Sequence, residues 1–404
     1  MGQGMTLRLQ VQERIRETML GPLREKLGYA IEHVEGGQRS RIFTPQITAT
    51  TMILSALQED KTLQNSVMLV NQISQREGVE VSLNTASYTT ARQRLTKDSM
   101  RKVYQDVVAK GLSGGSHWHK REVYLMDGTY IQLQDTPEIR DKYPFQQGHK
   151  CPSGLLVGVI HTGSGQLADF ELSDRYRTEL ELGHRIMQRL PKGSVVVADD
   201  LYGSFCFFYL AVHYGLDLVT PCKRKRSFKV IESLGKGDDL VEITFDRTRR
   251  KANGTLWWEK VDVAYPKTLQ LRRIQYTHPK NGKSCTLLTP LMDADISAQD
   301  IVLLYTKRWD IELSIRDLKT IMDIDIVRSK SEDMVFKELL AAFIAYNLIR
   351  QLMKEADPPS FFPSDEALFQ KVVTLTRSRP VDTLGRRPST GRPRRALTAP
   401  STQI

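Results

Sequence analysis

The sequence of 404 residues predicts an α/β protein with a helical region before it and a β-rich insertion inside it. Three observations support this fold class. Apolar residues recur at helical spacing up to about residue 110, strand-like alternation and short apolar runs begin after residue 120, and acidic residues follow two of the predicted strands. Strands that alternate with helices are typical of the α/β class.

The N-terminal region, residues 1–115, is predicted to be helical. Residues 9–27 and 48–74 both carry apolar side chains at the spacing of a helix face. Residues 111–120 contain several Gly and Ser residues and break this pattern, so they are interpreted as a linker.

The α/β domain is predicted over residues 120–355. Residues 121–135 alternate like a strand, and the Asp127-Gly128 pair predicts a turn that divides them into two strands. The apolar run from Val195 to Ala198 predicts a buried strand that leads directly into Asp199. The remaining predicted elements are strands at 154–160 and 216–221 and helices near 177–190 and at 203–215.

Residues 222–295 predict the β-rich insertion, because short apolar and aromatic stretches alternate there with basic turns. One of these stretches, around Trp257 and Trp258, is interpreted as a strand. Two long helices follow, roughly at 297–322 and 333–355. The C-terminal segment, 356–404, is rich in Pro, Gly, Ser and Arg from about residue 377 and is predicted to be a disordered basic tail.

Composition narrows the possible partners and compartments. The net charge of +11 favours a polyanionic partner, since basic side chains on a phosphate backbone release condensed counterions. The four cysteines form no CxxC pair, which argues against a zinc site or a disulfide framework and fits a reducing cytosol. No apolar run of about 18 residues is found, so no membrane span is expected. A cytoplasmic, nucleoid-associated protein is predicted.

The segment from Leu304 to Lys319 is the most informative. Four polar residues in it fall within a sector of about 60° if the segment forms one continuous helix: Tyr305, Arg308, Glu312 and Lys319. An apolar stripe lies beside them, formed by Leu304, Ile311, Ile315, Leu318 and Met322. The polar row is therefore expected to line a cleft at the edge of the core. Arg308 and Glu312 also fit an ordinary i,i+4 ion pair on a solvated face.

The spacing Tyr305-x2-Arg308-x3-Glu312-x6-Lys319 resembles the Tyr-Arg-Glu-Lys signature of bacterial insertion-sequence DDE transposases. "YLMDGTYIQL" and "VVVADDLYGSF" resemble the strands that carry the first and second aspartates of that family. The β-rich insertion lies between the second aspartate and the glutamate, as it does in the family. The resemblance covers about residues 120–350, and it implies a ribonuclease H-like catalytic domain preceded by a helical DNA-binding region.

The resemblance assigns metal binding to Asp127, Asp199 and Glu312. Two Mg²⁺ (or Mn²⁺) ions per active site are expected, because such ions prefer carboxylate oxygens and a pair of them can activate the attacking oxygen and stabilise the leaving one. Asp200 is an alternative to Asp199, which we favour because the apolar strand leads directly into it. Asp135 and Asp174 are interpreted as solvated loop residues.

For the residues expected to contact DNA, alternative interpretations remain. Tyr305, Arg308 and Lys319 are expected to hold phosphates through charge-assisted hydrogen bonds, although Lys319 also fits a plain surface lysine. Trp257, Trp258 and Trp309 are candidates for base stacking, with core packing as the alternative for the Trp257-Trp258 pair. Lys223 and Arg224 belong to a basic cluster that either contacts the DNA backbone or forms a solvated face.

These observations predict a DDE transposase that cuts and joins double-stranded DNA at the element ends and in the target. A homodimer is expected in the synaptic complex from the logic of the reaction. Two alternatives share many of these features: a DNA-binding regulator without catalysis, derived from a transposase, and a ribonuclease H-like nuclease without strand transfer.

Overall fold

The structure is a computed structural model. It describes residues 42–75, 84–112, 117–143, 145, 150–173, 177–223, 226–245, 257–278, 282–320 and 322–356. The helix predicted at 9–27, Asp174, Arg224 and the predicted tail from about residue 377 lie outside the described residues.

One mixed sheet organises the described part of the chain. Its strands are β1 (Val123–Gln132), β2 (Ser153–His161), β3 (Leu167–Leu172), β4 (Val195–Val197), β5 (Asp217–Pro221), β6 (Lys229–Gly235), β7 (Asp238–Thr244), β8 (Thr268–Thr277) and β9 (Ser284–Thr289). Their order is β3-β2-β1-β4-β5-β9-β8-β7-β6. β1, β4 and β5 are parallel, and the remaining neighbours are antiparallel. The β-rich segment therefore extends the central sheet, because β9 pairs with β5.

Four helices precede the sheet in the described part of residues 1–115. The helices before the sheet are α2 (Pro45–Ala56), α3 (Leu63–Gln75), α4 (Thr85–Arg94) and α5 (Lys97–Leu112). Those within and after the first strands are α6 (Pro137–Lys142), α7 (Glu179–Met187), α8 (Phe205–His213), the 3-10 helix η1 (Trp257–Lys260), α9 (Ala298–Thr306), α10 (Trp309–Thr320) and α11 (Glu332–Ala356). None of the described helices combines the length and the apolar run that crossing a bilayer requires.

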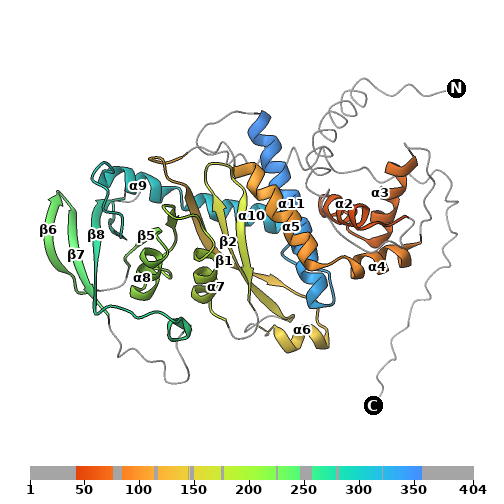
Figure 1. Ribbon diagram of the computed structural model, residues 1–404, viewed down its shortest axis with the longest axis horizontal. Helices are drawn as coiled ribbons and strands as arrows, with labels where there is room; N and C mark the ends of the chain where they lie inside the picture. Colours follow the sequence, from red (N-terminus) through yellow and green to blue (C-terminus); the bar gives the residue numbers. More distant parts are fainter. Residues whose placement is uncertain are drawn as a thin grey trace, which may run out of the picture.

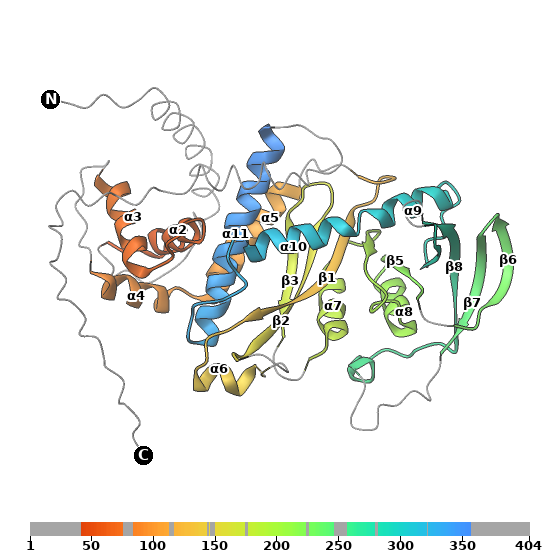
Figure 2. The same cartoon turned by 180° about the vertical axis from the view of Figure 1, so that it is seen from behind.

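Helices cover both faces of the sheet (Figures 1 and 2). α7 and α8 lie on one face, whereas α5, α10 and α11 lie on the other. A hydrophobic core lies on each face of the sheet. Successive side chains of β1 point into one core and then the other, because side chains alternate between the two faces of a strand. Tyr124 and Met126 pack with α7 and α8, whereas Val123 and Leu125 pack on the side of α11. Asp127 continues the alternation of Val123 and Leu125, so it belongs to the α10 and α11 side.

The helices before the sheet share a core with α11. α2 and α5 both pack against α11, and apolar residues of α2 to α5 are continuous with those of the sheet. Two lysines strengthen this junction. Lys337 of α11 donates to the backbone oxygen of Arg92 (3.0 Å), and Lys61 donates to the backbone oxygen of Met322 (2.5 Å). The start of α11 and the chain just beyond α10 are thus both attached to the N-terminal helices.

Two predicted elements are wrong. β1 runs without a turn through Asp127 and Gly128, which pair with Gly158 and Val157 of β2. An Asp-Gly pair often forms the turn of a β-hairpin. Here the chain does not reverse at this pair, because the residues on both sides of it pair with β2 in one continuous antiparallel ladder. The stretch around Trp257 and Trp258, predicted as a strand, begins a 3-10 helix.

The helix predicted at 297–322 is two helices. α9 ends at Thr306, and α10 begins at Trp309. Between them the N–H groups of Lys307 and Arg308 donate to residues three positions earlier, which tightens the backbone and interrupts the α-helical pattern. Four residues of the predicted apolar stripe are nevertheless buried, namely Leu304, Ile311, Leu318 and Met322, and Ile315 is partly buried against the same core. The helix predicted at 333–355 is confirmed as α11.

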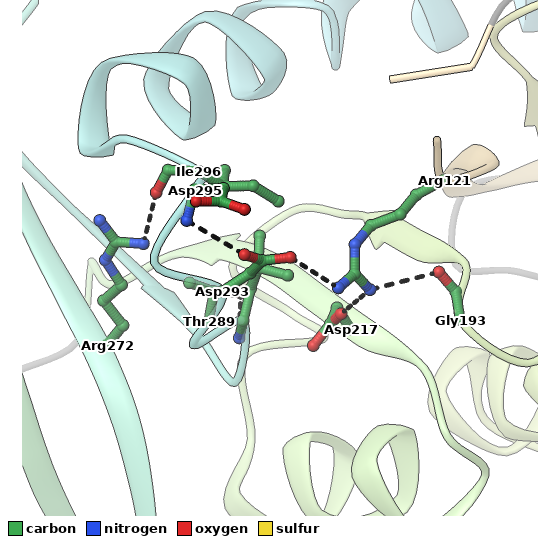
Figure 3. Close-up of polar contacts among 9 residues, drawn as sticks. Arg121, Gly193, Asp217, Arg272, Thr289, Asp293, Asp295 and Ile296 are labelled. Atoms are coloured by element: carbon green, nitrogen blue, oxygen red, sulfur yellow. Dashed lines mark hydrogen bonds and ion pairs between the residues drawn. The ribbon is translucent and has the colours of Figure 1, made fainter. Parts of the chain in front are cut away.

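The loop that leads into α9 is fixed to the sheet by ion pairs (Figure 3). Arg121, just before β1, contacts Asp217 at the start of β5 (2.9 Å) and Asp293 in the loop (3.3 Å). Arg272 of β8 donates to the backbone oxygen of Ile296 (2.8 Å) and pairs with the Asp238 carboxylate (2.6 Å). These contacts set where α9 starts, and hence where α10 crosses the sheet.

Candidate active site

Asp127 and Asp199 come together because of the register between β1 and β4. The parallel pairing aligns Leu125 with Val197, and two further residues along each chain are Asp127 and Asp199. β4 ends at Val197, so its chain leaves the sheet just before Asp199. The Leu201 N–H donates to Asp199 Oδ1 (2.8 Å), and the Gly128 N–H donates to Asp127 Oδ1 (2.9 Å). Local backbone contacts therefore orient both carboxylates at this edge.

The surroundings of Asp127 disfavour its charged form. Burial raises the pKa of the Asp127 carboxyl to about 6, and the nearby negative charges of Asp199 and Glu312 act in the same direction. The Gly128 N–H and the Arg308 guanidinium oppose this rise without cancelling it. Carboxylates from the end of β4 and from α10 thus both act on the carboxyl group of Asp127 on β1.

Glu312 lies in the first turn of α10, the helix that packs against β1. Ile311 and Leu318 are buried on the side of α10 that faces the sheet, which holds the helix against β1. The Glu312 carboxylate accepts a hydrogen bond from Arg308 Nη1 (2.7 Å), and the Arg308 guanidinium lies over the Trp309 ring at 4.7 Å. Arg308 is therefore a cation held next to the acids by both charge and stacking.

Tyr305 joins this group from the end of α9. Burial raises the pKa of the Tyr305 phenol, the Arg308 guanidinium lowers it, and the Asp199 carboxylate raises it. Tyr305 thus interacts electrostatically with Arg308 and Asp199, although the helix is interrupted after Thr306. The polar row predicted for a continuous helix is therefore preserved in part by the tight turn at Lys307 and Arg308.

Lys319 lies farther along α10. Seven residues separate it from Glu312, or about 10 Å along a helix axis. Its Nζ contacts Asp325 Oδ1 (3.0 Å). Both Lys319 and Glu312 line an open groove of about 660 Å³, together with Ile315, Arg316, Thr320, Asp323, Asp325 and Ile326. Lys319 thus shares a groove with Glu312 and pairs with an acid outside the predicted trio.

Asp199 and Asp200 have different surroundings. Asp200 Oδ1 accepts a hydrogen bond from the Lys223 N–H (3.0 Å), at the start of the chain toward β6. Asp199 instead interacts electrostatically with Asp127 and Tyr305. This difference favours Asp199 as the member of the acidic group. Asp135 is partly exposed and pairs with Arg140, away from these acids.

The predicted base-stacking residues are placed differently from one another. The ring centroid of Trp257 lies 6.1 Å from that of Phe207, and the Trp258 centroid lies 5.2 Å from that of Phe245. Both tryptophans are half-buried, and Trp257 packs against the core on the α7 and α8 side. Trp309 is 58% exposed beside Arg308. Lys223 is exposed, and Arg224 lies outside the described residues.

The acidic group suits a hard divalent cation by its donor chemistry. Its donors are carboxylate oxygens, which Mg²⁺ and Mn²⁺ prefer. Among the described residues, no three His, Cys, Asp or Glu side chains converge tightly enough to form a metal site as they stand. The Glu312 carboxylate is instead turned toward Arg308.

Two residues at this edge were not predicted from the sequence. Glu179 opens α7, and the Tyr202 hydroxyl donates to its Oε1 (2.9 Å). Burial raises the pKa of the Glu179 carboxyl, and the negative charges of Asp127 and Asp199 add to the rise. An acid in the first turn of a helix is common because it complements the helix dipole. No pattern in the sequence therefore distinguishes Glu179 from an ordinary helix-start residue.

Comparisons with known proteins agree on one family. A family model described as the transposase DDE domain matches residues 118–348. The chain is 28% identical over 281 residues to transposase InsG for insertion sequence element IS4 of Escherichia coli (strain K12), covering 66% of this chain and 61% of InsG. It is 35% identical over 68 residues to the transposase for insertion sequence element IS421 of Escherichia coli, covering 16% of this chain and 18% of that relative. The chain thus spans less than two thirds of the length of either relative.

A solved structure of a piggyBac transposase synaptic complex with hairpin DNA shows a limited likeness. The TM-score is 0.42 at 11% sequence identity, over 89% of this chain and 78% of that one.

Proposed function

Because the chain belongs to the transposase DDE domain family, we propose that it is a DDE transposase that binds element ends and catalyses metal-dependent cleavage and strand transfer of DNA. One observation carries the proposal for this chain. The register of β1 and β4 aligns Asp127 with Asp199, and the charge of Glu312 on α10 acts on the Asp127 carboxyl group. These are the three residues that the sequence resemblance assigns to catalysis.

In this proposal Asp127, Asp199 and Glu312 hold two Mg²⁺ or Mn²⁺ ions within a ribonuclease H-like domain. When bound, such ions activate the attacking oxygen and stabilise the leaving oxygen of a phosphodiester. The protein contributes rigid placement, since β1 and the end of β4 belong to the sheet and α10 is packed against it. It also contributes partial desolvation, because Asp127 is half-buried. Release of Glu312 from Arg308 is part of assembling the site.

Tyr305, Arg308 and Lys319 are proposed to contact the phosphates of the bound end, as the Tyr-Arg-Glu-Lys signature implies. Arg308 is suited to this role, because a guanidinium freed from Glu312 presents paired donors to a phosphate. Lys319 lines the same groove as Glu312, and this groove is proposed as the path of the DNA backbone. Lys223 and Arg224 are proposed as further backbone contacts from the insertion.

The remaining assignments concern the whole protein. The region of residues 1–115 is proposed to recognise the element ends, and two copies are proposed to hold two ends in the synaptic complex. Trp309 is exposed beside Arg308, so it is better placed for stacking on a base than Trp257 and Trp258, which pack against aromatic side chains. Stacking by Trp257 or Trp258 requires one of these rings to leave its present contacts.

A cleavage assay tests the proposal. Asp127→Asn is expected to reduce Mg²⁺- or Mn²⁺-dependent nicking of DNA carrying the element end by at least about 100-fold, since a metal ligand matters at least as much as the residues that support it. Asp200→Asn is the matched control and retains activity, because the Asp200 carboxylate receives the Lys223 N–H instead. Wild-type nicking by Asp127→Asn contradicts the assignment.

The same assay separates the alternatives. Strand-transfer products in a reaction with a second DNA identify a transposase, and nicking without joining identifies a nuclease. Specific binding to element ends with no product under Mg²⁺ or Mn²⁺ identifies a regulator without catalysis.

A further inference from the structure

α2, α3 and α4 form a three-helix unit at the end of the molecule opposite β6 and β7 (Figures 1 and 2). Each of the three helices packs against the other two. α4 is held in this unit by Tyr88, Ala91 and Leu95, which are all buried, and the ring centroid of Tyr88 lies 5.3 Å from that of Phe43. One side of α4 therefore faces the core, and its other side faces the solvent.

The solvent side of α4 is a continuous stripe of small and polar side chains. Five exposed residues form this stripe: Ala86, Ser87, Thr90, Gln93 and Arg94. At 100° per residue they fall within a sector of about 120°, opposite the three buried residues. α4 contains no acidic residue. The exposed residues of the next helix, α5, have the mixed charges that are common on a solvated face, because they include Asp98, Lys102 and Lys110.

The side chains of the stripe can bind a partner from outside the chain. No hydrogen bond or ion pair is found for the side chains of Ser87, Gln93 and Arg94 within the described part of the chain. The Thr90 hydroxyl donates to the Ala86 backbone oxygen (3.0 Å), a contact inside the helix. These residue types read base edges in DNA, since Arg matches guanine, Gln matches adenine, and Ser and Thr suit either.

The chain around the stripe is positively charged. From Asn84 to Lys102 it carries five basic residues and one acidic residue, which gives a net charge of +4. A positive excess of this kind favours a phosphate backbone, because bound basic side chains release condensed counterions. The stripe thus offers hydrogen bonds for base edges, and its surroundings offer charge for phosphates. Double-stranded DNA is the partner that fits both.

The C-terminal end of α4 is fixed to the domain that carries the candidate acids. Lys337 of α11 is 1% exposed, and its Nζ donates to the backbone oxygens of Arg92 (3.0 Å) and Gln93 (3.3 Å). Oxygens in the last turn of a helix lack partners within the helix, so this lysine caps α4. α11 also packs against β3. A duplex bound to α4 would therefore have a defined orientation relative to the sheet.

We propose that α4 lies in the major groove of the element end and reads its base pairs through Ser87, Thr90, Gln93 and Arg94. The inference rests on the proposed function, because the element end is the DNA that residues 1–115 are proposed to recognise. It specifies the helix, the side chains and the groove. The major groove is about 12 Å wide and admits an α-helix, whereas the minor groove is about half as wide.

The test is a selection of bound duplexes from a randomised DNA library by the full-length protein. Wild type is expected to enrich one sequence motif. Arg94→Ala is expected to lose at least about fivefold of the preference at one or two base pairs of that motif, because a paired contact to one base discriminates by at least this factor. Gln93→Ala is expected to lose a preference at a neighbouring position.

Lys102→Ala is the matched control, because it also removes one exposed positive charge but lies on α5. It is expected to keep the wild-type motif and to change the affinity for all duplexes by the same factor. All substituted positions are exposed, so the unfolding temperatures are expected to stay close to that of wild type.

Arg94→Gln distinguishes base reading from a structural role. Arg pairs with guanine and Gln pairs with adenine, so this substitution is expected to change the preferred base at one position from guanine to adenine. A wild-type motif in both Arg94→Ala and Gln93→Ala overturns the inference, as does a loss of preference that Lys102→Ala reproduces.

The same selection separates this inference from the proposed function. If wild type enriches a motif that the α4 variants also enrich, α4 is not the reading helix and specific end binding stands. If wild type enriches no motif, both the inference and the proposed recognition of element ends are refuted.

Discussion

At the residue scale, the candidate site depends on side chains whose neighbours are distant in sequence. Asp127 and Asp199 are predictable, because each follows apolar strand residues in a recognisable context. Glu179 is not, because its contact with Gly128 depends on how α7 packs across the sheet. The Asp-Gly pair itself was misread as a turn: glycine is needed there for close approach and not to reverse the chain.

His161, away from the acids, predicts a pH dependence of stability. It is fully buried on β2, where its Nδ1 contacts Ser164 Oγ (2.9 Å) and its Nε2 lies 3.3 Å from Glu122 Oε2. Burial lowers the pKa of the imidazole to about 4, and the Glu122 carboxylate only partly opposes this. The unfolded chain therefore binds this proton at a higher pH than the folded chain does.

The stability contributed by neutral His161 is present above about pH 6.5 and is lost as the pH falls toward 4. Between pH 7 and pH 5, wild type is expected to lose about 2 kcal/mol more unfolding free energy than His161→Gln does. Urea unfolding of both proteins at the two pH values measures this difference. Parallel losses in the two proteins contradict the assignment.

At the element scale, α10 is the structure on which the catalytic assignment depends. Apolar periodicity predicted its buried side, but the break between α9 and α10 was not predictable, because residues 297–322 contain neither Gly nor Pro. The break lies where Arg308 pairs with Glu312 and stacks on Trp309. α10 is anchored to α11 through Asp317 and Arg350, a pair that the sequence pattern does not indicate.

The Asp317–Arg350 pair predicts a large loss of stability on truncation. The two side chains are each 3% exposed and 3.0 Å apart, and Arg350 also donates to the Tyr346 hydroxyl (3.0 Å). Asp317→Ala leaves a buried guanidinium without its carboxylate, so the free energy of unfolding is expected to fall by about 3–5 kcal/mol. Chemical denaturation measures the change.

Arg328→Ala is the control for that experiment. Its ion pair with Asp323 is 47% and 46% exposed, and such a surface pair contributes at most about 1 kcal/mol. Equal losses of stability in Asp317→Ala and Arg328→Ala contradict the view that the buried pair anchors α10.

At the scale of the whole molecule, the α/β class and the β-rich segment were predictable from periodicity, but their union in one sheet was not. Strand pairing such as β9 with β5 is a long-range choice that local patterns do not encode. The same holds for the core that α2 and α5 share with α11. This shared core and the sheet together fix the positions of β1, β4 and α10 relative to one another.

The central claim is that Asp127, Asp199 and Glu312 bind one set of divalent ions. Localised cleavage by Fe²⁺ with ascorbate and peroxide tests it most directly, because iron in a carboxylate site cuts the backbone nearby. Fragments that end near residues 127, 199 and 312, and that disappear with excess Mg²⁺, are the result we predict. Cleavage elsewhere only, or cleavage at these positions that excess Mg²⁺ leaves unchanged, would contradict it.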